Sequence, residues 1–236
     1  MYFLFCLSWN QIHELFNNHS HNQSMPSSQP LRRTRDAERS KTAILEAATQ
    51  LFAAQGFEAT SIGEIAEKAG MARGTPSYFF GSKEALLEAV IADLNARALV
   101  IVPQALERAG ENPSSARLLE VFIDGYLDFH HQNPEFLRVI HWISRDSNPL
   151  MSLTYWNSLE AMISAVMLTF KNTPLEREDP RHVALTLIGM CNAHLSYAHS
   201  IVGPLGFDSS DPEFLEARKT HLKRMMLEVL HGSSRP

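Results

Sequence analysis

Several features are missing from this 236-residue sequence, and each absence narrows the class of protein. No apolar run approaches the roughly 20 residues that span a bilayer, so no membrane-spanning helix and no membrane partner are expected. The two cysteines, Cys6 and Cys191, are too few for a disulfide framework or a multi-cysteine zinc site, which favours a reducing, cytoplasmic setting. The chain also lacks a G-x-S-x-G motif, an H-E-x-x-H motif and a phosphate-binding loop, so nothing in it indicates an enzyme.

An excess of basic residues is missing as well. The chain has 21 Lys and Arg against 26 Asp and Glu, a net charge of −5, which excludes a histone-like or polybasic protein. The placement of charge is more informative than its sum: the balance is about +1 within residues 25–85 and about −6 elsewhere. The acidity therefore belongs mostly to the C-terminal part, and the N-terminal part remains compatible with binding to nucleic acid.

The first 30 residues contain little that could be buried, and we expect residues 1–30 to form a disordered N-terminal extension. The apolar run 2–9 lacks the basic flank and the cleavage site of a secretory signal. We interpret residues 1–24, which precede Met25, as an appendage or an over-extended gene start. A weakly bound membrane-surface anchor is the alternative.

From Leu31 onward the sequence predicts an all-α protein of about nine helices. Apolar residues recur at the 3.6-residue period, prolines stand where helices can begin, and no strand-like alternation with hairpin turns is present. In the segment 71–80, Tyr78 and Phe79 are expected on the inward side of the helix. All the expected helical segments are 40–52, 61–69, 71–80, 83–109 with a kink or break at Pro103, 114–132, 135–146, 150–171, 181–201 and 213–230.

Two short helices joined by a tight turn are expected between Thr60 and Lys83. Ser61-Ile62-Gly63-Glu64 has the capping-box pattern that opens a helix. Ala66 stands four residues before Gly70, a spacing that lets two helices cross closely and the chain turn sharply. The pattern predicts a helix-turn-helix, in which the second helix enters the major groove of DNA. A helical hairpin that binds no DNA is the alternative.

Three adjacent stretches, Ile44 to Phe57, Ala59 to Gly70 and Met71 to Leu86, carry a resemblance to a known family. They resemble the TetR family of transcriptional regulators. The first stretch is similar to the family's first helix and the second stretch to its second helix. The third stretch is similar to the recognition helix and the start of the fourth helix. The resemblance implies a three-helix DNA-binding domain over residues 31–85. A helical ligand-binding and dimerisation domain is expected over residues 86–236.

The resemblance also implies roles for individual residues. Phosphate contacts are expected from Thr60, Ser61, Tyr78 and Lys83. Base edges are expected to face Arg73, Gly74, Thr75 and Ser77, with Arg73 as the candidate for a guanine. A basic arm before the first helix, suited to phosphates or a minor groove, would consist of Arg32, Arg33 and Arg35. A solvated tail without a defined partner is the alternative for this arm.

Two residues depart from the family's pattern. Ala72 stands where a capping Ser or Thr is common, and Pro76 where a larger aliphatic residue is usual. If the recognition helix begins at Ala72, then Pro76 falls in its first turn, where a missing N–H is tolerated. The departures leave a second hypothesis open, a ligand-binding or adaptor protein of the same fold that has lost DNA recognition.

The two C-terminal segments are expected to pair with their copies across a two-fold axis, as they do in the family. A homodimer of this kind implies a near-palindromic double-stranded operator. Packing of these faces within one chain is the alternative. A pocket for a small-molecule effector is expected from aromatic and polar residues of the middle helices: Tyr126, His130, His141, Trp142, Tyr155, Trp156, Met162 and Asn192.

No cofactor and no metal are expected. His130 and His131 are adjacent and point apart on a helix, whereas His194 and His199 are five residues apart, not the three or four that converge on one ion. The sequence thus favours a repressor released from its operator by an inducer that binds two dimer geometries unequally. A helical enzyme that uses His130, His141 or His194 with a carboxylate is the remaining alternative.

Overall fold

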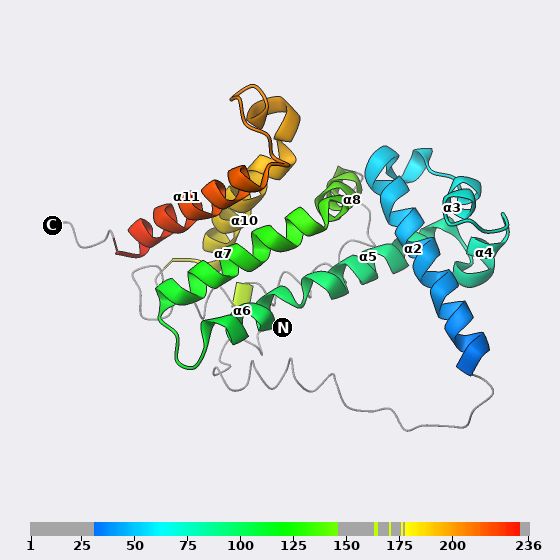
Figure 1. Ribbon diagram of the computed structural model, residues 1–236, viewed down its shortest axis with the longest axis horizontal. Helices are drawn as coiled ribbons and strands as arrows, with labels where there is room; N and C mark the ends of the chain where they lie inside the picture. Colours follow the sequence, from blue (N-terminus) through cyan, green and yellow to red (C-terminus); the bar gives the residue numbers. More distant parts are fainter. Residues whose placement is uncertain (1–30, 146–162, 165–169, 171–175, 177, 232–236) are drawn as a thin grey trace. The chain divides into compact units, whose positions relative to one another are not determined.

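The computed structural model describes residues 31–145, 163, 164, 170, 176 and 178–231 (Figure 1). Over this part of the chain it contains nine α-helices and one π-helical turn, and no β-strand. The all-α fold class is therefore confirmed. The predicted extension 1–30 and most of the predicted helix 150–171 lie outside the described residues. None of the described helices is long and apolar enough to cross a membrane.

Two compact units divide the chain and are treated separately. The N-terminal unit has described residues 31–97 and 135–145, and the C-terminal unit has described residues from 98–134 and from 163 onward. The helices of the N-terminal unit are α2 (Leu31–Ala59), α3 (Ile62–Lys68), α4 (Thr75–Phe80), α5 (Lys83–Ala98) and α8 (Pro134–Arg145). Those of the C-terminal unit are α6 (Ile101–Ala109), α7 (Ser115–Gln132), α10 (Pro180–Ser196), the π-helical turn η3 (Ala198–Val202) and α11 (Pro212–His231).

Helix α2 begins at Leu31, earlier than the predicted start at Ser40. The Ser40 hydroxyl donates to the carbonyl of Asp36 at 2.9 Å, one turn back, so Ser40 lies inside the helix and does not cap it. The helix is kinked at Gly56, the predicted stop, which has a φ of 82° and a ψ of 172°, and it continues beyond the kink to Ala59. Only glycine adopts this backbone conformation without strain.

Two further boundaries differ from the prediction because of proline. Helix α4, predicted over residues 71–80, starts at Thr75 and not at Met71, since a helix continued back to Ala72 would bring the Ala72 carbonyl against the Pro76 ring. The predicted helix 83–109 is interrupted after Ala98, which confirms the break expected at Pro103 but places it before the proline. The Pro103 ring would meet the carbonyl of Leu99 in a continuous helix.

The N-terminal unit holds α2, α3 and α4 in mutual contact (Figure 1). Its apolar positions follow the predicted 3.6-residue period, and each of these helices buries one face. The fully buried side chains include those of Ile44, Ala48, Ile65, Ala66 and Leu86. This packing fixes the orientation of α4, which is too short to be stable alone.

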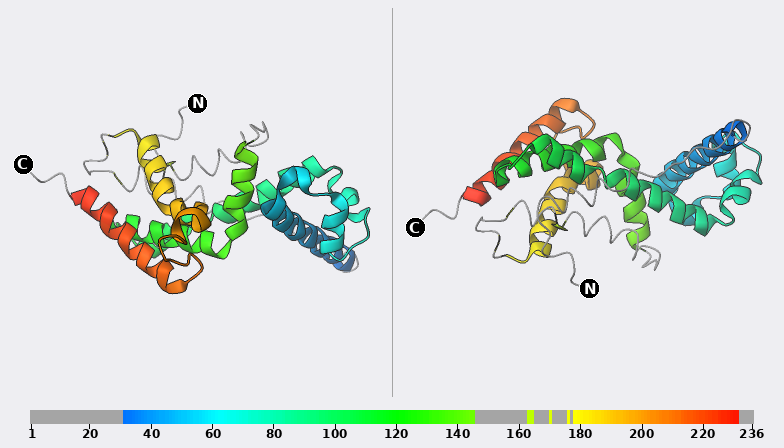
Figure 2. Two further views of the ribbon diagram at one scale, coloured as in Figure 1. Left: turned by 90° about the horizontal axis from the view of Figure 1, so that it is seen from above. Right: turned by 90° about the horizontal axis from the view of Figure 1, so that it is seen from below.

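The C-terminal unit is built around α7, which contacts both α6 and α11. Figure 2 shows α7 and α11 side by side in both views. Its hydrophobic core includes Leu119, Ile123 and Leu127 of α7 and Leu222 and Met226 of α11. The helix predicted over 181–201 ends at Ser196 and is followed by η3.

Candidate nucleic-acid interface

Helices α3 and α4 are joined by a tight turn. Gly70 has a φ of 69°, a left-handed conformation that favours glycine, and the Met71 N–H donates to the carbonyl of Ala66 at 2.8 Å. Ala66 is fully buried, and its small side chain lets the two helices approach closely. The turn predicted from the Ala66 and Gly70 spacing is therefore present.

The exposed surface of α4 carries the side chains predicted to read DNA. Ser77 is exposed, and Tyr78 is 83% exposed with its ring edge-on to Phe79 at 5.2 Å. The prediction that Tyr78 faces inward is wrong: Pro76 is the buried residue of this helix, and burying it turns the Tyr78 position toward solvent. The phenol is thus free to meet a partner outside the chain.

Arg73 and Gly74 lie in the turn that leads into α4. Arg73 is exposed, and a Cβ atom on Gly63 would stand 3.5 Å from Nε of Arg73, so the arginine side chain passes over the side-chain-free position of α3. No ion pair holds Arg73 within the described part of the chain. Gly74 is the N-terminal cap of α4, and a Cβ atom there would meet nothing within 4 Å. Thr75 follows, half-buried.

Ser61 caps α3 in the predicted capping box. The Ser61 hydroxyl accepts from the Glu64 N–H at 3.2 Å, and the Glu64 carboxylate accepts from the Ser61 N–H at 2.8 Å. The Ser61 hydroxyl also donates to this carboxylate at 2.7 Å. The bonds from Ser61 lower the pKa of Glu64, which keeps a negative charge at the first turn of α3.

Thr60 and Lys83 make contacts inside the unit. Thr60 is buried, and its hydroxyl donates to the carbonyl of Gly56 at 2.7 Å. The Lys83 ammonium donates to the carbonyls of Phe57 and Thr60 at 2.9 and 3.1 Å and lies 4.2 Å from the centre of the Phe57 ring. These bonds attach the start of α5 to the end of α2.

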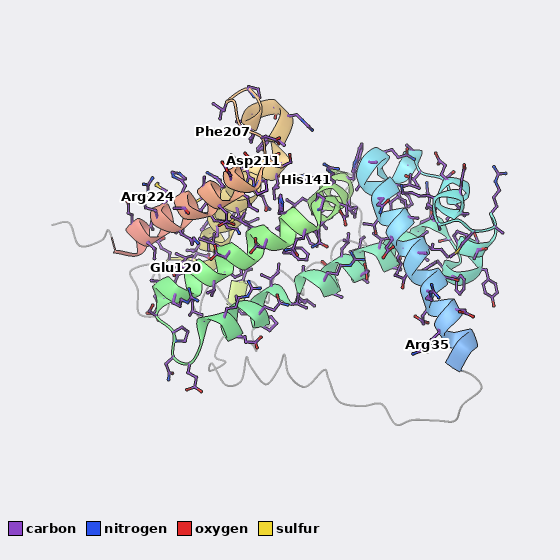
Figure 3. The ribbon with its side chains drawn as sticks, in the orientation of Figure 1. Arg35, Glu120, His141, Phe207, Asp211 and Arg224 are labelled. Carbon is purple, nitrogen blue, oxygen red and sulfur yellow. The ribbon has the colours of Figure 1, made fainter. Side chains whose placement is uncertain are left out.

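The basic residues predicted as an arm before the first helix lie within α2 itself. Arg32 and Arg33 belong to its first turn, and Arg35 is exposed close to its N-terminal end (Figure 3). The helical backbone gives these residues defined positions, which an arm without secondary structure would lack.

The predicted effector-pocket residues fall into three groups. Tyr126, His130 and Asn192 lie together in the C-terminal unit: the Tyr126 hydroxyl donates to Asn192 Oδ1 at 3.0 Å, and the rings of Tyr126 and His130 are 4.4 Å apart. His141 and Trp142 lie on α8 of the N-terminal unit, where His141 is exposed and Trp142 packs against Gly56. The predicted pocket residues outside the described part of the chain are Tyr155, Trp156 and Met162.

Two residues beside the first group, His194 and Arg218, were not predicted to belong to the effector pocket. Burial, and then the nearby charge of Arg218, lowers the pKa of His194 to about 4. Burial lowers the pKa of His130 to about 4 as well, with a smaller electrostatic effect of the nearby His194, so both imidazoles are neutral at pH 7. Arg218 lies three residues after the buried Leu215 and four before Leu222, a spacing that marks the edge of an apolar stripe and could have revealed it. Among the described residues, no three His, Cys, Asp or Glu side chains could hold a metal ion.

A crossed pair of short helices, with an exposed arginine, serine and tyrosine on and before the second, defines a helix-turn-helix DNA-binding protein. Residues 44–90 match the family model described as bacterial regulatory proteins, tetR family. Residues 44–90 thus carry the DNA-binding domain of the TetR family of transcriptional regulators. The function that this match supports is regulation of transcription, not catalysis.

Similarity to individual proteins extends beyond the matched domain. The HTH-type transcriptional regulator RutR of Escherichia coli K12 is 26% identical over 201 residues, which cover 84% of this chain and 93% of RutR. The HTH-type transcriptional repressor SCO4008 of Streptomyces coelicolor is 32% identical over 108 residues, 46% of this chain and 51% of SCO4008. The crystal structure of FadR from Bacillus subtilis in complex with stearoyl-CoA shares the fold with a TM-score of 0.59 at 16% identity, over 78% of this chain and 96% of FadR.

Proposed function

We propose that the protein is a repressor that binds a near-palindromic operator as a homodimer and releases it when a small-molecule inducer binds. The observation that carries this proposal is the exposure of Arg73, Ser77 and Tyr78 on a segment whose opposite side is anchored by buried Pro76. Side chains at the start of the second helix of a helix-turn-helix meet base edges in the major groove.

Each exposed group suits a different part of DNA. The Arg73 guanidinium can donate two bonds to the O6 and N7 atoms of guanine. Ser77 can contact a base edge or a phosphate, and the Tyr78 hydroxyl a phosphate. Gly74 and Thr75 lie between these groups, where the glycine lets the helix approach the floor of the groove. Ser61 and Arg35 are exposed and complete the proposed contacts, whereas Thr60 is left out because it is buried, and Lys83 because it is half-buried with its ammonium bonded to the carbonyls of Phe57 and Thr60.

The alternative hypothesis of an adaptor that has lost DNA recognition rested on Ala72 and Pro76. Neither residue disturbs the exposed surface: Ala72 precedes α4, and Pro76 lies in its first turn, where a missing N–H leaves no helical bond unmade. The geometry therefore favours DNA binding over the adaptor hypothesis.

Exposed apolar side chains support the homodimer. Leu185 of α10 is 67% exposed, and Met225 and Val229 of α11 are 40% and 48% exposed. Large apolar groups gathered in the surface of one pair of helices mark a protein–protein interface. A two-fold axis there would set the two copies of α4 against half-sites about 34–36 Å apart.

Repression and release by a small molecule are supported by two relatives. SCO4008 is a transcriptional repressor by name, and FadR was crystallised with stearoyl-CoA. An inducer shifts the equilibrium only by its differential affinity for the DNA-bound and free geometries. We infer that this chain has such a ligand, of its own chemistry.

The experiment is fluorescence anisotropy of the full chain with DNA from upstream of its own gene, at several salt concentrations. We expect specific, salt-dependent binding, and a loss of about 10- to 100-fold for Arg73→Ala. Arg108→Ala, an exposed arginine of the C-terminal unit, is the matched control and should bind as the parent does. Absence of specific binding, or no effect of Arg73→Ala combined with Thr75→Ala, contradicts the proposal.

A further inference from the structure

A guanidinium without a counter-ion lies between α10 and α11. Arg218 is half-buried, and its Nη2 donates to the carbonyl of Met190 at 2.9 Å. Its Nε is buried and makes no hydrogen bond, and no carboxylate pairs with Arg218 anywhere in the described part of the chain. Withdrawing a charge from water is unfavourable unless it is paired, so this arrangement calls for an anion.

Two lysines of α11 near Arg218 in the sequence, unlike Arg218, have acidic partners. Lys219 is 6% exposed, and its ammonium lies 2.6 Å from both Asp128 and Glu216. Burial disfavours its charge, but the bonds to these carboxylates outweigh burial, and the pKa of Lys219 is raised. The Lys223 ammonium likewise lies 2.7 Å from Asp124. The described residues thus include acids that pair with these two lysines and none that pairs with Arg218.

No described residue beside Arg218 carries the missing negative charge. Burial raises the pKa of the Cys191 thiol to about 12, so this group is neutral at pH 7. His194 is 4% exposed and neutral, and its Nδ1 makes no hydrogen bond to any described residue. Burial lowers the pKa of Arg218, but a guanidinium stays protonated at pH 7. One positive charge and two unused buried nitrogens therefore remain.

An aromatic surface adjoins this cluster. Phe214 lies one turn before Arg218 on α11, and its ring centre is 5.8 Å from that of His194 and 5.4 Å from that of Phe207. Phe207 is 56% exposed and stands on the segment between η3 and α11 (Figure 3). Aromatic side chains thus connect the buried His194 with solvent.

We propose that Arg218 and His194 bind the carboxylate of a small amphipathic acid whose apolar body lies along Phe214 and Phe207. The planar guanidinium presents Nε–H and Nη–H groups that match a carboxylate, and the negative charge of the carboxylate balances the charge of Arg218. The apolar part of the ligand covers ring surface that is otherwise open to water. The assignment rests on the proposed function, because this acid would be the inducer.

The test is calorimetric titration of the full-length protein at pH 7 with butanoate, octanoate, dodecanoate and 4-phenylbutanoate, each compared with its primary amide. At least one acid should bind about tenfold more tightly than its amide, the ratio expected for a charge-assisted bond. Arg218→Gln should remove this preference, Arg218→Lys should retain part of it, and Arg224→Gln, on the exposed side of α11, should leave it unchanged. Absence of any acid preference across the series, or its survival in Arg218→Gln, overturns the inference.

Operator binding by the same samples separates this inference from the proposed function. A preference for acids that depends on Arg218, without operator binding, supports the site and contradicts the proposed function. Operator binding without an acid preference supports the proposed function and contradicts the site. If Arg218→Gln dissociates the dimer while the parent protein shows no acid preference, the anion is a carboxylate of a second copy of the chain, and the inference fails.

Discussion

Trp142 of α8 lies against Gly56 at the end of α2: a Cβ atom on Gly56 would stand 2.9 Å from Cε3 of the indole ring. Gly56 also has a φ of 82°, which side chains rarely adopt. Two separate constraints therefore act on this residue, one from its backbone and one from its neighbour.

We expect Gly56→Ala to lower the free energy of unfolding by about 2–4 kcal/mol, since strain at this φ and ψ adds to crowding against the indole. Urea denaturation followed by circular dichroism measures the change. Gly189→Ala is the matched control: Gly189 lies within α10 with nothing within 4 Å of its Cβ position, so alanine should raise stability by about 0.5–1 kcal/mol.

A double-mutant cycle separates the two constraints. In a Trp142→Ala background the crowding is gone and only the backbone strain remains, so Gly56→Ala should cost about 1–3 kcal/mol less there than in the parent chain. Equal costs in the two backgrounds would show that the indole does not restrain this position.

The bonds from Lys83 to the end of α2 predict a second effect. Lys83→Met removes the donor to the carbonyls of Phe57 and Thr60, and we expect a loss of about 1–2 kcal/mol, reduced by the partial exposure of the ammonium. Lys68→Met, at an exposed lysine of α3, should change stability by less than about 0.5 kcal/mol. If both variants unfold at the same urea concentration as the parent, Lys83 does not stabilise the junction.

Local sequence signals predicted much of the fold because their physical causes are local. Ser61 and Glu64 are three residues apart and meet within one turn, so the capping box could be predicted from spacing alone. Pro134, Pro180 and Pro212 each occupy the first position of a helix, as expected for a residue that lacks an N–H.

Tertiary contacts decided what the sequence left open. The bonds of the Lys83 ammonium to carbonyls 23 and 26 residues earlier were not predicted, because no local pattern spans that distance. Tyr78 was predicted on the inward side of its helix, and the burial of Pro76 turned it outward. The spacing of Arg218 to Leu215 and Leu222 marks it as a residue at the edge of the core, but the sequence could not show that it lacks a carboxylate partner, because that depends on where the folded chain places the acids of α7.

The buried histidines predict a dependence of stability on pH. The pKa values of His130 and His194 are lowered to about 4 in the folded chain, mainly by burial, against an ordinary value of 6.5. The unfolded chain therefore takes up protons between pH 6.5 and pH 4 that the folded chain does not, and stability must fall as the pH is lowered through this window. Each unit of difference corresponds to about 1.4 kcal/mol, so the loss amounts to several kcal/mol.

Urea titrations from pH 7 to pH 4 measure this dependence. His194→Gln removes one of the two groups and should flatten the curve, whereas His182→Gln, at an exposed histidine of α10, should leave its slope unchanged. A parent protein equally stable at pH 6.5 and pH 4.5 would contradict the lowered pKa values.

Tyr78 and Arg35 should contribute to DNA binding in ways that can be told apart. Tyr78→Phe removes a neutral hydroxyl from a residue that is 83% exposed, so folding stability should be unchanged and affinity should fall by about fivefold. Because a phosphate contact carries no sequence information, the loss should be equal on specific and altered operators, and the salt dependence should stay the same. Arg35→Ala removes a charge instead, and should reduce the slope of log K against log salt by about 0.9. Anisotropy titrations at several salt concentrations compare the two variants. A loss in Tyr78→Phe confined to one operator sequence would place the phenol against a base.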